Sequence, residues 1–178
     1  EVICLNDCDQ QVKSQAVYNG RKTSPGLRFG GTNEHFLAAN QFAIEQGRNF
    51  TAEDIELARP VILIGQGILK KLFIAESPLG KIIKIKDRTY TVIGTFAEKG
   101  AQFGDSQDDI GVVPLTRFLN DFGSERVTVN IATQAPSQLS YNETIERAIT
   151  AMRVVRGLKP EQENDFELYS NDSLIATF

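Results

Sequence analysis

The chain is poor in the residues that bind metals. Its 178 residues include two cysteines and one histidine. A structural zinc site needs about four Cys or His ligands, so this composition does not suggest one. Cys4 and Cys8 stand close together in the sequence, and a local disulfide between them stays open if the segment is irregular. The cysteines therefore do not identify a cellular compartment.

Long apolar runs are also missing. No stretch approaches the ~20 apolar residues that a membrane-spanning helix needs. The first residue is Glu1 rather than Met, and an apolar run begins at residues 173–178. We therefore expect a fragment of a longer protein, with any membrane helices outside this chain. The apolar fraction of 41% and the charged fraction of 24% are typical of a folded domain.

A positive charge excess is missing as well. The formal net charge is −4 and the sequence pI is about 5.1. A nucleic-acid-binding domain usually carries a clustered basic face, so we expect no nucleic-acid partner. The densest basic group favours a solvated face of a β-hairpin, and only weakly a contact with anionic lipid. It consists of Lys81, Lys84, Lys86 and Arg88.

Motifs for catalysis and cofactor binding are incomplete. Gly65-Gln66-Gly67 resembles half of a dinucleotide fingerprint, but Lys70 stands where the third glycine would be, so a tight turn explains it. Asp105, Asp108 and Asp109 lie in a polar loop that departs from the spacing of a calcium loop. We therefore expect no catalytic residue, no cofactor and no metal site. A hydrolase with an unrecognised site in this loop stays a further hypothesis.

Apolar periodicity and turn residues predict a mixture of strands and helices. Asn19-Gly20 predicts a tight hairpin turn, and Thr51 predicts a helix start. Val61–Ile64 is a continuous apolar run, as in a strand buried on both faces. The predicted strands are 11–18, 21–23, 27–32, 42–44, 61–64, 81–86, 90–96, 110–114, 126–133 and 165–170, and the predicted helices are 34–40, 52–58, 68–73, one from residue 115, and 140–156.

A set of short, spaced motifs runs from Gly47 to Pro114. They are Gly47-Arg48-x-Phe50, Asp54, Arg59-Pro60-Val61, Ile64-Gly65, Leu72-Phe73, Ser77-Pro78-Leu79-Gly80-Lys81, Tyr90-Thr91-Val92-Ile93-Gly94, Gly104, Asp108-Asp109 and Val113-Pro114. With Asp165-Phe166-Glu167 and Ser170, this set resembles the periplasmic core domain of MacB-type ABC transporter permeases. The resemblance covers roughly residues 27–178.

The resemblance implies an α+β fold of two lobes. One is a porter-like lobe of β-α-β units, formed by residues 1–50 and 125–178. The other is an inserted mixed α/β lobe, formed by residues 51–124. A strand, a long helix and a strand over residues 126–170 fit a β-α-β unit of the porter-like lobe.

The resemblance also implies a function at the periplasmic face of the bacterial inner membrane. The domain would couple ATP hydrolysis in the cytoplasm to export of amphipathic cargo, or to mechanical work across the envelope. The ATPase domain would lie outside this chain. The implied partners are a periplasmic adaptor, an outer-membrane duct and a second copy of the full-length transporter.

Rocking of two lobes against each other requires hinges, and glycines absorb dihedral changes at low cost. The candidate hinges are Gly47, Arg48 and Asn49, and Gly123, Ser124 and Glu125. These segments are also compatible with simple turns. An alternative function is an extracellular ligand-sensing or scaffolding domain that binds a peptide or a lipoprotein.

Overall fold

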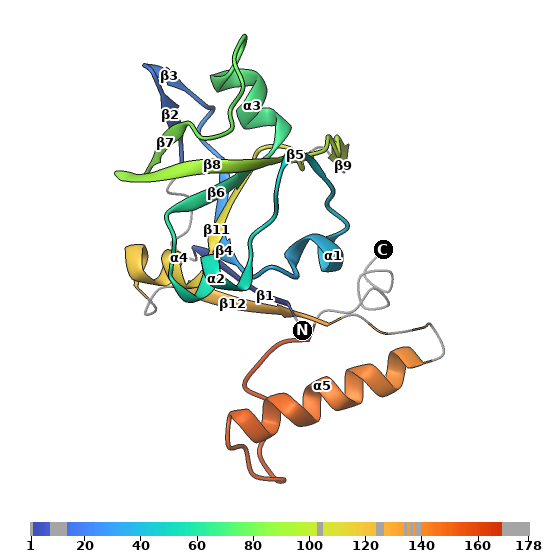
Figure 1. The fold of residues 1–178 in the computed structure, drawn as a ribbon. Helices are drawn as coiled ribbons and strands as arrows, with labels where there is room; N and C mark the ends of the chain where they lie inside the picture. Colours follow the sequence, from blue (N-terminus) through green and yellow to red (C-terminus); the bar gives the residue numbers. More distant parts are fainter. Residues whose placement is uncertain are drawn as a thin grey trace. The chain divides into compact units, whose positions relative to one another are not determined.

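The computed structural model describes residues 2–7, 14–102, 105–123, 127–133, 135, 137 and 140–168. The chain divides into two compact units, Glu1–Ala132 and Thr133–Phe178. The first unit is a mixed β-sheet with short helices, and the second contains one long helix (Figure 1). The predicted α+β class is therefore confirmed.

The first unit is built on one mixed sheet. Its strands run in the order β12-β1-β4-β11-β6-β8-β7-β2-β3, and β5 pairs with β8 beside this path. The pairs β4–β11 and β6–β8 are parallel, whereas the others are antiparallel. The strands are β1 (Val2–Asp7), β2 (Ala16–Tyr18), β3 (Arg21–Lys22), β4 (Arg28–Thr32), β5 (Ile44–Gly47), β6 (Val61–Ile64), β7 (Ile82–Ile85), β8 (Arg88–Phe96), β11 (Ile110–Pro114) and β12 (Val127–Ala132).

Strands from all three predicted segments join this sheet. β4 comes from residues 1–50, β11 from residues 51–124, and β12 from residues 125–178. The division into a porter-like and an inserted lobe at these boundaries stays a prediction.

Two tight turns join neighbouring antiparallel strands of the sheet. Asn19 and Gly20 join β2 to β3 with φ of 45° and 79°, as the Asn-Gly pair predicts. Lys86 and Asp87 join β7 to β8 with φ of 46° and 66°. The predicted connection at 87–89 is therefore displaced toward the N-terminus, because a two-residue turn with two positive φ values lets Ile85 pair directly with Arg88.

Alternating residues of β6 point to opposite faces of the sheet and join different cores. Ile62 and Ile64 belong to one core, together with residues of α3 (Gln66–Leu72) and α4 (Leu115–Phe122). Leu63 belongs to the other, together with residues of α1 (Phe36–Asn40) and α2 (Ala52–Glu56). All three side chains have no exposed surface, as a strand buried on both faces requires.

Two predictions about strand positions need correction. The strand predicted at 42–44 corresponds to β5, which lies at Ile44–Gly47 because this segment is the one that pairs with β8. The last predicted strand is wrong for residues 165–168, where the described chain has a bend and irregular backbone but no strand. Arg156 binds Asp165 there through a side-chain ion pair of 2.6 Å, in a segment that folds back on the helix before it. Tyr169 and Ser170 lie outside the described residues.

The second unit centres on α5 (Tyr141–Val155), the long helix predicted for 140–156. The apolar stripe of this helix is only half-buried, and Val155 at its end is 81% exposed. The stripe consists of Tyr141, Ile145, Ala148, Ile149, Met152 and Val155. A β-α-β unit over residues 126–170 is therefore incomplete in the described chain. β12 pairs antiparallel with β1, and no strand follows α5 up to residue 168.

Candidate functional site

Three of the predicted hinge residues begin a segment that we call the β5–β6 corner, residues 47–60. Gly47 is the last residue of β5 and lies opposite Gly94 of β8. Its φ is +82°, and an added Cβ would overlap the carbonyl oxygen of Ile93 and lie 2.8 Å from the Cα of Gly94. Glycine is therefore needed here for the close approach of two strands as well as for its backbone conformation.

The centre of the corner is the carboxylate of Asp54, whose side chain has no exposed surface. Its Oδ2 accepts a hydrogen bond of 2.6 Å from Arg48 Nη1, and bonds of 3.0 Å from both the N–H and the hydroxyl of Thr51. Its Oδ1 accepts bonds of 3.3 Å from Arg48 Nη2 and from Arg59 Nη1. A buried carboxylate is stable only with such partners.

The sequence explains part of this arrangement. Thr51 and Asp54 form a reciprocal capping box at the start of α2, in which the Thr51 hydroxyl accepts the Asp54 N–H. The predicted role of Thr51 as the helix start is therefore confirmed. The sequence does not predict that Asp54 binds two arginines, because an acid in the first turn of a helix is usually explained by the helix dipole.

Hydrogen bonds decide the protonation state of Asp54. Burial by itself raises the pKa of this carboxyl, but the bonds from Arg48 and Thr51 outweigh burial and hold the pKa well below its usual range. The same pair raises the pKa of Arg48, chiefly through the hydrogen bond to Asp54. The corner therefore contains an ionised pair at any physiological pH.

The corner is also tied to its neighbours. Asn49 Nδ2 donates to the carbonyl of Glu34 just before α1 at 2.8 Å, and the Thr116 hydroxyl in α4 donates to the carbonyl of Ile55. The N–H of Arg48 donates to the Ile93 carbonyl in β8 at 3.1 Å. The first predicted hinge therefore lies in a densely bonded segment of the sheet.

The second predicted hinge follows α4. Gly123 ends this helix with φ +80°, and an added Cβ would meet no atom within 4 Å. Ser124 and Glu125 lie outside the described residues. Both hinges stay predictions.

The polar loop at 97–109 is anchored by Asp108. This carboxylate accepts the N–H groups of Lys99 and Gly100 at 2.9 and 3.1 Å. Asp109 pairs with Lys71 of α3 at 2.9 Å. Asp105 lies in β10 (Asp105–Ser106), which pairs with β9 (Ala101–Gln102) in a separate two-stranded sheet. Asp108 and Asp109 are thus engaged in holding the loop rather than facing each other across a cleft.

This loop explains the Gly65-Gln66-Gly67 turn. The N–H of Gly67 donates to the Asp108 carbonyl at 3.0 Å, and an added Cβ on Gly67 would lie 2.8 Å from the Asp109 Cγ. The glycines therefore admit the loop, and no ligand is needed to explain them. Among the described residues, no group of three or more His, Cys, Asp or Glu side chains is placed to hold a metal ion.

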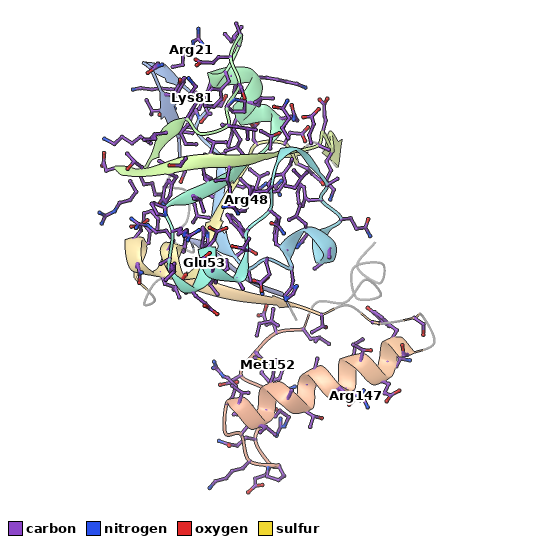
Figure 2. The ribbon with its side chains drawn as sticks, viewed as in Figure 1. Arg21, Arg48, Glu53, Lys81, Arg147 and Met152 are labelled. Atoms are coloured by element: carbon purple, nitrogen blue, oxygen red, sulfur yellow. The ribbon has the colours of Figure 1, made fainter. Side chains whose placement is uncertain are left out.

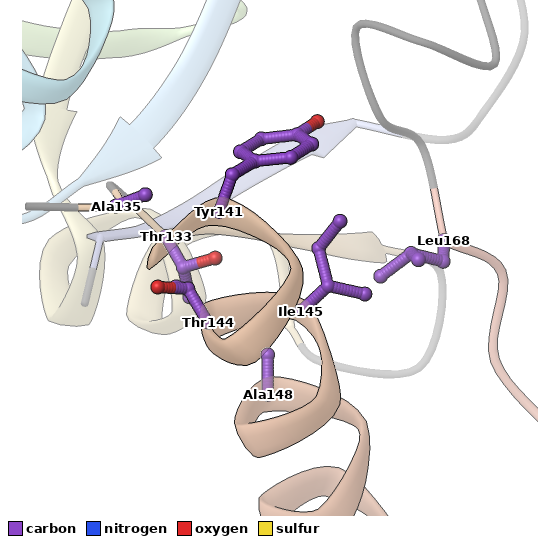
Figure 3. Close-up of a pocket in the computed structure, with 7 residues that line it drawn as sticks. All are labelled: Thr133, Ala135, Tyr141, Thr144, Ile145, Ala148 and Leu168. Atoms are coloured by element: carbon purple, nitrogen blue, oxygen red, sulfur yellow. The ribbon is translucent and has the colours of Figure 1, made fainter. Parts of the chain in front are cut away.

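A small pocket lies within the second unit (Figure 3). Its volume is about 80 Å³, well below the roughly 300–1,000 Å³ of typical ligand sites. It is therefore too small for amphipathic cargo. Its lining residues are Thr133, Ala135, Tyr141, Thr144, Ile145, Ala148 and Leu168. No helix in the described part of the chain is long and apolar enough to cross a membrane.

Comparison with known proteins places this architecture. Residues 8–151 match the family model of the MacB-like periplasmic core domain. A macrolide export ATP-binding/permease protein MacB of Rhodopirellula baltica is 34% identical over 127 residues, which are 71% of this chain and 18% of that protein. The pyoverdine export ATP-binding/permease protein PvdT of Pseudomonas aeruginosa is 32% identical over 150 residues, 82% of this chain and 22% of that protein. The chain thus spans about a fifth of each relative.

Solved structures share the fold. The periplasmic region of MacB from Actinobacillus actinomycetemcomitans superposes with a TM-score of 0.73 at 17% identity, covering 98% of this chain and 74% of that one. The extracellular domain of the transporter YknZ from Gram-positive bacteria has a TM-score of 0.69 at 23% identity, covering 88% and 76%. The resemblance inferred from the spaced motifs is confirmed, and this chain belongs to the MacB-like periplasmic core domain family.

Proposed function

We propose that this chain is the periplasmic module of a MacB-type ABC transporter permease, and that it passes on motion driven by ATP hydrolysis in the cytoplasm. The observation that carries the proposal is the family match over residues 8–151. The relatives named as exporters of macrolides and pyoverdine support export of amphipathic cargo as the outcome. A periplasmic adaptor, an outer-membrane duct and a second transporter copy are the partners of this proposal.

The architecture supports a mechanical role. The unit Glu1–Ala132 carries a core on each face of one sheet, and the corner at residues 47–60 is held by several ion pairs and hydrogen bonds. Such a body resists bending, because a packed interior deforms little. Rocking between stiff bodies requires short connections that absorb the change in angle. The lobe boundaries near residues 50 and 124, and the hinge at Gly123, Ser124 and Glu125, belong to this proposal.

The proposal includes the absence of a catalytic site in this chain. Asp108 and Asp109 already bind backbone N–H groups and Lys71. Purified protein should therefore turn over no generic ester, peptide or glycoside substrate. Turnover that disappears in an Asp108→Ala variant with an unchanged melting temperature would overturn this part.

A flexible insertion tests the mechanical role. A four-residue Gly-Ser insert between Ala132 and Thr133, in the full-length transporter, should lower export per ATP hydrolysed, because a flexible linker does not transmit force. The matched control places the same insert between Asn19 and Gly20, at an exposed hairpin tip that tolerates insertions.

The two inserts separate the hypotheses. A mechanical module loses export with the first insert and keeps it with the second. A ligand-sensing or scaffolding domain keeps ligand binding with both, since its site does not depend on a stiff connection. Unchanged export per ATP with the insert after Ala132 would therefore refute the proposed role.

A further inference from the structure

One side chain joins the end of β5 to the helix that precedes β6. Arg48 follows β5 directly, and its guanidinium contacts both oxygens of the Asp54 carboxylate in α2, at 2.6 and 3.3 Å. The same guanidinium donates to the Asn49 carbonyl at 2.9 Å. A planar guanidinium with two bonds to one carboxylate fixes the relative orientation of the two groups as well as their distance.

The corner that Arg48 closes is connected to several elements. At its start the Arg48 N–H is bonded to β8, and at its end the Pro60 carbonyl accepts the N–H of Thr91, also in β8, at 2.8 Å. Asn49 adds a bond to the segment before α1, and Ile55 adds one to α4. Without the Arg48–Asp54 pair, α2 would lose its direct side-chain tie to the end of β5.

We propose that Arg48 is a positioning residue for the transport motion, because it fixes α2 to the end of β5 and so makes the β5–β6 corner one stiff piece. The inference rests on the proposed mechanical function and adds a residue to it. Gly47, Arg48 and Asn49, which the sequence suggests as a hinge, then have the opposite role. They form a fixed joint, and bending at this joint would uncouple export from ATP hydrolysis.

Two other arginines provide matched controls. Arg59 also contacts Asp54, at 3.3 Å, but it follows α2 and does not reach back to β5. Arg117 binds the carboxylate of Asp121 at 2.7 Å, and that side chain is only 4% exposed. Both residues of this second pair lie in α4, so the pair does not connect two elements of the corner. Figure 2 labels Arg48, which follows β5, and Glu53, which lies in α2.

The test compares Arg48→Gln, Arg48→Lys, Arg59→Gln and Arg117→Gln in the full-length transporter. Spin labels at the exposed positions Glu56 in α2 and Thr89 in β8 report the stiffness of the corner through the width of their distance distribution. Export per ATP hydrolysed reports coupling. The assay temperature is chosen from melting curves so that every variant is folded.

We expect Arg48→Gln to broaden the distance distribution and to lower export per ATP severalfold while ATP hydrolysis continues. Arg48→Lys, which keeps the charge but not the two-pronged contact, should restore part of both properties. Arg59→Gln and Arg117→Gln should change neither, although each also removes a cation from a buried carboxylate. A purely stabilising role would instead make all three glutamine variants lose export in proportion to their loss of melting temperature.

If Arg48→Gln folds, either of two outcomes overturns the inference. A folded Arg48→Gln transporter with a narrow distance distribution contradicts the stiff joint, whatever the result of the linker insertions. A broadened distribution with unchanged export per ATP contradicts the coupling role, even if the insert after Ala132 confirms the mechanical function. If Arg48→Gln does not fold, the Arg48→Lys variant provides the test. A wild-type distance distribution and wild-type export per ATP in Arg48→Lys would then refute the proposal.

Discussion

The close packing of β5 against β8 is tested most directly by Gly47→Ala. The methyl group would overlap the Ile93 carbonyl oxygen and come within 2.8 Å of the Gly94 Cα, both of them backbone atoms that cannot rotate away. Gly80 is the matched control, since its φ is +75° and an added Cβ there would meet no atom within 4 Å. The two substitutions therefore share the cost of a positive φ and differ in steric overlap.

The magnitude follows from these two terms. An L-residue at positive φ costs roughly 1–2 kcal/mol, so Gly80→Ala should lose about that much stability. Gly47→Ala should lose about 1–3 kcal/mol more, the usual range for inserting a methyl group into a packed site. For a chain of this size 1 kcal/mol corresponds to about 2–4 °C, so the melting temperature of Gly47→Ala should lie about 2–12 °C below that of Gly80→Ala.

The assay is thermal unfolding of both variants, followed by circular dichroism under identical conditions. A Gly94→Ala variant provides a second check on the packing of β5 against β8, because its methyl group would lie 2.7 Å from the Arg48 carbonyl oxygen. Equal melting temperatures for Gly47→Ala and Gly80→Ala would refute the argument, since only backbone strain would then matter at Gly47.

Three further predictions concern buried polar groups and the long helix. Because the folded-state pKa of Asp54 is lowered, its ionised form contributes stability that is fully present above the ordinary Asp pKa of about 4 and is lost as the pH falls further. Urea unfolding should therefore show a steeper loss below about pH 4 in the wild type than in Asp54→Asn, and parallel pH profiles would contradict this. Tyr90→Phe removes a 2.8 Å bond to Asp121 and should lower the free energy of unfolding by about 1 kcal/mol, whereas a stability within error of wild type would mean that the bond adds nothing. Ile149→Asp, on the half-buried stripe of α5, should lower the free energy of unfolding of the unit Thr133–Phe178 by about 1–2 kcal/mol and reduce the helical circular dichroism signal. The melting transition of the unit Glu1–Ala132 should not change. An undiminished helical signal would show that Ile149 faces solvent.

Local features of the fold could be predicted where a short segment determines its own conformation. Asn19-Gly20 fits the two positive φ values of a hairpin turn, and Thr51 with Asp54 fits a capping box. The run Val61–Ile64 predicts a strand buried on both faces, which the structure confirms. Each of these depends on residues a few positions apart, so no long-range information is needed.

The candidate site could not be predicted in the same way. Asp54 looks like an ordinary acid at a helix start, and only the structure shows that its side chain is fully buried and bound by both Arg48 and Arg59. The Gly65-Gln66-Gly67 turn looks like part of a nucleotide site until Asp108 and Asp109, some 40 residues later, are found against it. The last strand failed for a related reason, since alternating residues at 165–168 form a strand only if a sheet edge is available to them.

The sequence by itself determined most of the elements, the Asn19-Gly20 turn and the family, because these follow from local patterns and from the spacing of short motifs. Only the tertiary structure decided that β4 runs parallel to β11 and β6 to β8, and that a glycine and an arginine close the β5–β6 corner. Strand order, and the close approach of Gly47 to Gly94 of β8, depend on which surfaces meet when the chain collapses. A segment of ten or fifteen residues does not contain that information.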